Sequence, residues 1–118
     1  MNICNRGFRE FKDCVVLYPD NYLNDIEGEK IEDECNDFLK RGKRKVVIDF
    51  TNTDIINSIG ISILVGIMKK VRREEGLIFL SGLKKVNHDI FNMLGLIKDI
   101  PTFTTEEEAL EQLVANDR

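Results

Sequence analysis

A polar pair, Asn57-Ser58, lies where an apolar strand gives way to an apolar helix. Residues 46–50 have the pattern of a buried strand, and the helical pattern begins at Ser58. The first backbone N–H groups of a helix have no partner within it, and the helix dipole adds partial positive charge there. A serine hydroxyl at this position is well placed to carry and hold a phosphate group. We therefore interpret Ser58 as a candidate phosphoacceptor.

Ser58 also has a purely structural interpretation as the N-cap of this helix. Its hydroxyl would then accept a hydrogen bond from a backbone N–H near Ile61. Asn57 could be the cap instead. The structural and chemical roles are compatible, because a capping hydroxyl stays partly exposed.

The helix that begins at Ser58 has apolar residues on more than one side. On a helical projection the stripe predicted to face the sheet contains Ile61, Leu64, Val65, Met68 and Arg72, with Val71 at its edge. Ile59 and Ile63 fall on the opposite side with Gly66, and Ile67 lies on the flank. Apolar side chains on an outer face favour a docking surface for another protein, although isolated surface isoleucines are common.

The remaining sequence alternates between apolar strands and amphipathic helices. Strands are expected at 8–11, 14–18, 46–50 and 77–80, with a short strand or extended segment at 100–103. Helices are expected at 25–41 and 58–75, followed by a short helix carrying Val86, Ile90, Met93 and Leu94 and a last helix starting at Thr104 or Thr105. This order predicts one α/β domain over residues 1–118, with a mixed, mostly parallel β-sheet and about four helices packed against it.

Loops at the carboxyl ends of parallel strands gather at one edge of a sheet, where sites commonly form. Residues 20–24, 52–58 and 81–84 are the loops expected at that edge. The residues predicted to bind a partner there are Asp20, Asn21, Asn24, Asn57, Ile59, Gly60, Ser62, Ile63, Gly66, Ile67, Ser81 and Gly82.

Composition argues against several other functions. The net charge of −4 does not favour nucleic acid binding. Cys4, Cys14 and Cys35 have no metal-binding spacing, and Cys14 and Cys35 fit apolar patterns as small buried side chains. The single histidine, His88, lies in a helix, and no nucleophile or phosphate-loop motif accompanies it. We expect neither catalysis, nor a metal, nor a cofactor.

The basic run at 69–73 is expected to be a solvated helix end, where cations suit the dipole. No signal peptide or bilayer-spanning run is visible, so we expect a cytoplasmic protein that does not bind membranes. Asp49 ends a buried strand, as the acceptor of a response-regulator receiver would. The acidic pair that a receiver needs is absent, so Asp49 is predicted to cap backbone groups of the following turn.

Residues 45–113 resemble the STAS domain, and specifically the single-domain anti-sigma factor antagonists of bacteria. The segments VVIDF, NSIGIS, LIFLSGL, FNMLGL and EEEAL appear in the family's order and spacing. The resemblance implies a partner-switching regulator rather than an enzyme. The unmodified protein would bind an anti-sigma factor that is also a serine kinase, phosphorylation of Ser58 would release it, and a PP2C-type phosphatase would reset it.

One residue departs from the family pattern, since Asn57 occupies the place of an aspartate. Two alternatives to the phosphoswitch stay open. The first is a constitutive interaction or scaffold module of the same fold, in which Asn57 marks the loss of switching. The second is an accessory subunit of a lipid-transport complex, because such subunits also use this fold.

Overall fold

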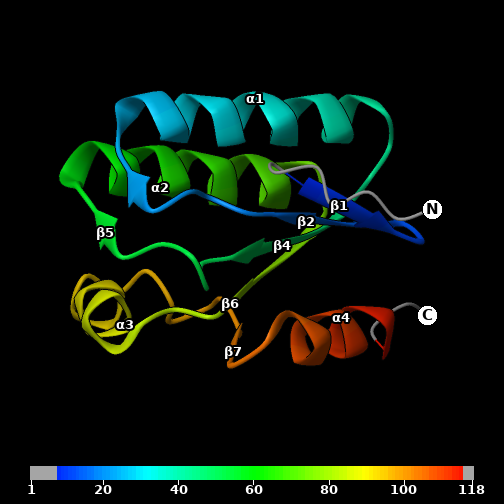
Figure 1. The fold of residues 1–118 in the computed structure, drawn as a ribbon. Helices are drawn as coiled ribbons and strands as arrows, with labels where there is room; N and C mark the ends of the chain where they lie inside the picture. Colours follow the sequence, from blue (N-terminus) through cyan, green and yellow to red (C-terminus); the bar gives the residue numbers. More distant parts are fainter. Residues whose placement is uncertain (1–7, 116–118) are drawn as a thin grey trace.

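The computed structural model describes residues 8–115, in which a five-stranded sheet is flanked by helices (Figure 1). The elements in chain order are β1 (Phe8–Phe11), β2 (Cys14–Leu17), β3 (Tyr22–Leu23), α1 (Asp25–Lys40), β4 (Lys45–Asp49), β5 (Ile55–Ile56), α2 (Ser58–Arg73), β6 (Leu77–Ser81), α3 (Lys85–Met93), β7 (Thr102–Phe103) and α4 (Glu106–Ala115). The predicted order of strands and longer helices is confirmed, with boundaries shifted by one or two residues. Cys4 lies outside the described residues.

The continuously apolar strands β2, β4 and β6 occupy the middle of the sheet, whose order is β1-β2-β4-β6-β7. Strand β1 pairs antiparallel with β2 through the turn at Lys12-Asp13, and every other pair in this sheet is parallel. Helices α1 and α2 connect parallel strands and cover one face of the central strands, and the terminal helix α4 covers the other. The predicted mixed, mostly parallel sheet is confirmed.

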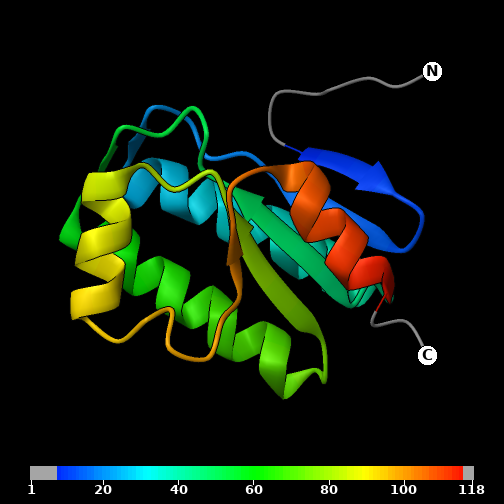
Figure 2. The ribbon, with the colours of Figure 1, turned by 90° about the horizontal axis from the view of Figure 1, so that it is seen from below.

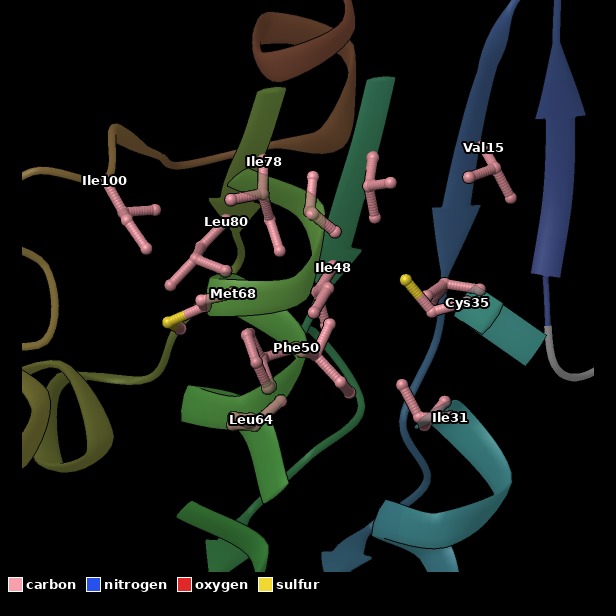
Figure 3. Packing of buried hydrophobic residues seen from close by; sticks show 14 of the residues in the cluster. Val15, Ile31, Cys35, Ile48, Phe50, Leu64, Met68, Ile78, Leu80 and Ile100 are labelled. Carbon is pink, nitrogen blue, oxygen red and sulfur yellow. The ribbon is translucent and has the colours of Figure 1, made fainter. Parts of the chain in front are cut away.

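Two groups of buried side chains hold the layers together. Helices α1 and α2 lie on one face of the sheet and α4 lies on the other (Figures 1 and 2). Side chains that alternate along β2, β4 and β6 pack against α1 and α2. Figure 3 shows Met68 close to Leu80 and Leu64 close to Phe50, with Ile31 and Cys35 on the side of the strand that carries Val15. The opposite face of these strands packs against Ala109, Leu110 and Leu113 of α4.

The helix ends follow the signals in the sequence. The Asn24 side chain accepts a hydrogen bond from the Glu27 N–H at 3.0 Å, and Gly42 ends α1 with a φ of +90°. The Thr105 hydroxyl accepts a hydrogen bond from the Glu108 N–H at 3.2 Å, and the Glu108 carboxylate accepts one from the Thr104 N–H at 3.1 Å, which is a variant of the capping box at the start of α4. None of the helices within residues 8–115 is long and apolar enough to cross a bilayer.

The sequence did not predict the two-residue strands β3 and β5, which pair in parallel as a separate small sheet. They lie in the loop before α1 and the loop before α2. Tyr22 pairs with Ile55, and Leu23 pairs with Ile56. This small sheet therefore fixes the starts of the two helices relative to each other.

The prediction of which α2 side chains point outward was wrong in part. Helix α1 packs alongside α2 on the same face of the sheet and covers some of them. Ile67 is only 1% exposed, and Ile63 is half-buried. A Cβ atom built on Gly28 of α1 would lie 2.7 Å from Cδ1 of Ile63, so this glycine makes room for the isoleucine. The side of α2 that looks outward when only the sheet is considered is thus covered by a neighbouring helix.

Candidate functional site

The amino end of α2 forms a corner that β5 and an asparagine cap hold in place. The Asn57 side-chain oxygen accepts a hydrogen bond from the Gly60 N–H at 2.8 Å, so Asn57 is the N-cap of α2. The backbone N–H of Asn57 donates to the Leu23 carbonyl at 3.1 Å. Ser58 is consequently the first helical residue and is free of the capping role.

Ser58 is exposed, as its candidate role requires. Within the described part of the chain, no hydrogen bond engages its hydroxyl, and none engages the backbone N–H groups of Ser58 and Ile59. The first turn of α2 contains no acidic residue. The positive end of this helix dipole therefore lacks a nearby side-chain anion on its own helix, which favours an anionic group attached to Ser58.

The three loops expected at this edge of the sheet do meet. The Asp54 N–H donates to the Asn21 carbonyl at 2.9 Å, which joins the first loop to the second. The Lys84 ammonium donates to the Thr51 carbonyl and lies 3.4 Å from the Asp54 carboxylate, which joins the second loop to the third.

Asp49, at the end of β4, forms hydrogen bonds to the second loop and to the end of β6. Its carboxylate accepts hydrogen bonds from the Thr51 N–H at 3.0 Å and from the Ser81 hydroxyl at 2.6 Å. The predicted role of Asp49 as a local cap is therefore confirmed.

The predicted partner-binding residues divide by exposure. Those exposed are Asp20, Asn21, Ile59 and Ser62, and those half-buried are Asn24, Asn57, Ile63, Gly66 and Gly82. Gly60, Ile67 and Ser81 are buried, which corrects the expectation that they line an outer surface. Gly60 lies tight against the Leu23 carbonyl, Ile67 enters the main core, and the Ser81 hydroxyl bonds to Asp49.

The structure adds apolar residues that the sequence interpretation missed. Tyr22 and Ile55 are register partners in the small sheet and are 47% and 59% exposed. The Asn57 amide nitrogen donates to the Tyr22 hydroxyl at 3.2 Å, which brings the ring next to the cap of α2. Ile59, which follows Ser58 in the chain, is 53% exposed. We call Tyr22, Ile55, Ser58 and Ile59 the Ser58 surface.

Helix α3 buries Asn87 and Phe91, and Ile90 is half-buried against the main core. Val86, Met93 and Leu94 are exposed, with Met93 80% exposed. The Asn87 amide donates to the Asp54 carbonyl at 3.2 Å, so this helix also supports the loop before Ser58.

Neither cysteine within the described residues has the environment of a reactive thiol. Cys14 and Cys35 are buried, as predicted. Burial raises the pKa of Cys35 to about 11, which keeps the thiol protonated at neutral pH. Among residues 8–115, no cluster of three or more His, Cys, Asp or Glu side chains is arranged to hold a metal ion. Half-buried His88 lines a surface cleft with Thr51 and Lys84.

The chain is similar to proteins that are described as anti-sigma factor antagonists. The chain is 28% identical over 87 residues to the candidate anti-sigma factor antagonist BtrV of Bordetella bronchiseptica, over 74% of this chain and 75% of that protein. The crystal structure of the candidate anti-sigma factor antagonist TM1081 of Thermotoga maritima has the same fold, with a TM-score of 0.83 at 20% identity. That match covers 91% of this chain and 92% of the other.

The fold also matches that of SpoIIAA, an anti-sigma factor antagonist and Bacillus cell fate determinant. The TM-score is 0.73 for its unphosphorylated form, at 18% identity over 92% of this chain and 96% of the other. The phosphorylated form gives the same TM-score at 20% identity, over 89% and 96%. The family model described as the STAS domain matches residues 7–109. This chain therefore belongs to the STAS domain family.

Proposed function

We propose that this protein is an anti-sigma factor antagonist that binds an anti-sigma factor through the Ser58 surface and is released when Ser58 is phosphorylated. The observation that carries the proposal is the exposed, unengaged Ser58 hydroxyl at the start of α2, with apolar side chains around it. The family and the descriptions of its relatives support this function.

Tyr22, Ile55 and Ile59 are suited to a protein partner. Each leaves about half of its surface in water, and apolar groups of this kind gain free energy when a partner covers them. Tyrosine is also enriched at interface centres, because its ring is large and its hydroxyl can stay hydrogen-bonded. The partner is expected to cover these three side chains and to lie directly over the Ser58 hydroxyl.

Phosphorylation would act on such a complex more than on the fold. A kinase would transfer the terminal phosphoryl group of ATP to the Ser58 oxygen, and ADP and the hydroxyl proton would leave. The phosphate adds about −1.5 to −2 charge at pH 7. Within this protein the phosphate would lie near free N–H groups and the positive end of the helix dipole, which favour it. A partner that covers Ile59 would have to desolvate the phosphate charge, and this cost would weaken the complex.

Asn57 is compatible with this switch. It provides the cap of α2 without adding a carboxylate beside the phosphate, and its amide hydrogen bonds to Tyr22. An aspartate could accept the same bond from Gly60 but would repel a neighbouring phosphate. The change from the family's aspartate thus lowers the electrostatic cost of modification at this corner.

Calorimetric titration of an anti-sigma factor with serine kinase activity tests the proposal. Ser58→Ala should bind like the wild type, and Ser58→Asp should bind at least tenfold more weakly. Asn92→Asp adds the same charge at an exposed position on α3 and serves as the control. Incubation of the wild type with the kinase and ATP, followed by intact mass measurement, should show one phosphate that Ser58→Ala lacks. Equal binding by Ser58→Ala and Ser58→Asp, with no phosphate gained, would instead indicate a constitutive interaction module.

A further inference from the structure

Positive charge is concentrated at the end of the molecule opposite Ser58. Nine of the 17 lysines and arginines lie in residues 40–45 and 69–75, against two of the 21 acidic residues. Helices α1 and α2 run in the same direction, so their carboxyl ends meet there (Figure 1). A hydrogen bond of 2.8 Å from the Lys70 ammonium to the Asn36 side chain connects the two helices near this end.

A cleft of about 350 Å³ lies between these helix ends. It is lined by Asn36, Leu39, Lys40, Lys70, Arg73 and Glu74. Three cationic side chains therefore border one concavity, and Leu39 gives it an apolar component. Among the lining residues within 8–115, Glu74 is the only one with a carboxylate.

Most carboxylates near this end are already paired with other cations. Arg41 pairs with Asp37, Lys43 with Glu10, Lys45 with Asp13, and Arg44 with Glu74. Within residues 8–115, Lys40 and Arg73 have no carboxylate within 4.0 Å, and Lys70 contacts the neutral Asn36 amide. The cleft thus keeps positive charges that the fold does not neutralise.

The helix dipoles explain part of this charge, because cations are favoured at helix carboxyl ends. That effect acts on the last turn of each helix and does not require three cations to border one cleft, where they repel each other. We propose that this cleft, here called the cationic cleft, is a second interaction site that binds an acidic segment of a partner protein. This inference goes beyond the proposed function and does not depend on Ser58.

The surroundings favour a short acidic peptide over a nucleic acid or a membrane. Helix α1 carries Asp33 and Asp37 within one turn of Asn36, which lines the cleft, and these carboxylates would repel a long polyanion that extends past it. A flat anionic bilayer would engage a concave site poorly. A peptide can place two or three carboxylates against Lys40, Lys70 and Arg73, with one apolar side chain near Leu39.

The test uses the full chain and a synthetic peptide, acetyl-Glu-Asp-Leu-Glu-Glu-Asp-amide, at 150 mM salt. Backbone amide signals should shift at residues 36–41 and 69–74 and not at Ser58. The double variant Lys40→Glu/Arg73→Glu should bind at least tenfold more weakly. Both residues are exposed and outside carboxylate pairs, but they lie in the last turns of α1 and α2, where the helix dipole disfavours a glutamate. The variant should therefore unfold a few degrees below the wild type and keep the wild-type circular dichroism spectrum at the temperature of the binding assay.

The control variant Lys12→Glu/Lys98→Glu changes the net charge by the same amount at exposed positions outside the cleft, and it should bind within twofold of the wild type. An equal loss of affinity in both double variants would show a non-specific charge effect and overturn the proposal. So would shifts confined to other residues, or tighter binding to a single-stranded oligonucleotide or to vesicles containing phosphatidylglycerol. Because the readout is at the cationic cleft, a failed Ser58 switch leaves this result interpretable.

Discussion

Two isoleucines one helical turn apart on α2 should respond oppositely to the same substitution. Ile59 is exposed in the first turn, whereas Ile63 is half-buried against Gly28 of α1. We expect Ile59→Asp to fold normally and to lose partner binding. We expect Ile63→Asp to destabilise the fold itself, because its side chain belongs to the contact between two helices.

The size of each effect follows from the surroundings. Complete burial of an isoleucine contributes about 1.5–3 kcal/mol, so loss of the half-buried Ile63 side chain costs about 1–1.5 kcal/mol. Partial desolvation of the new carboxylate raises the total cost to about 2 kcal/mol. At Ile59 an aspartate faces water in the first turn of a helix, where the dipole favours it by about 0.3–1 kcal/mol.

Urea unfolding followed by circular dichroism measures the free energy of unfolding of each variant, and thermal unfolding followed in the same way measures its Tm. A loss of about 2 kcal/mol corresponds to a decrease of roughly 8 °C in Tm for Ile63→Asp, while Ile59→Asp should unfold at or slightly above the wild-type temperature. The control Ile63→Val keeps the apolar contact and should lose less than about 1.5 kcal/mol. If Ile63→Asp were as stable as the wild type, the contact between α1 and α2 would not contribute to stability and the corrected facing of α2 would be wrong.

Two further substitutions test other parts of the structure. Gly60→Ala would place a Cβ atom against the Leu23 carbonyl, and we expect it to lower the free energy of unfolding by at least about 2 kcal/mol in urea titrations, whereas Gly66→Ala, which has open space, should be harmless. Burial raises the pKa of Glu106 above its ordinary 4.5, despite its hydrogen bond from Tyr18 and the nearby Arg9. Its contribution to stability is therefore complete below pH 4.5 and is lost as the pH rises through the folded pKa. Glu106→Gln should lack this loss, so the wild type should weaken relative to the variant as the pH rises from about 4.5. If the difference in free energy of unfolding between the wild type and Glu106→Gln stayed constant across this pH range, the raised pKa of Glu106 would be contradicted.

The sequence was sufficient for the sheet and for most helix ends, because those features depend on local patterns. Continuous apolar runs identified the central strands, and short connections required parallel pairing. The caps at Asn24 and Thr105 rest on contacts three or four residues apart, which a sequence displays directly. The STAS resemblance was carried by segments spread over most of the chain and is confirmed by the family match.

The parts that sequence could not predict depend on neighbours far apart in the chain. Ile63 was assigned to the surface because a helical projection cannot show that Gly28 lies against it. Strands β3 and β5 have two residues each, too short for an alternating pattern to be recognised, so the exposure of Tyr22 and Ile55 could not be anticipated. The choice between Asn57 and Ser58 as cap was open because both residue types cap helices well.

The position of Tyr22 gives this protein a built-in optical signal. The chain has no tryptophan and two tyrosines, so its intrinsic emission comes from Tyr18 and Tyr22. Tyr18 donates a hydrogen bond to the Glu106 carboxylate on the far side of the sheet, whereas the Tyr22 ring is half in water beside Asn57. The emission of Tyr22 therefore depends on its surroundings at the start of α2, and the emission of Tyr18 depends on its surroundings at α4. Label-free spectroscopy on Tyr18→Phe can therefore follow events at the corner alone.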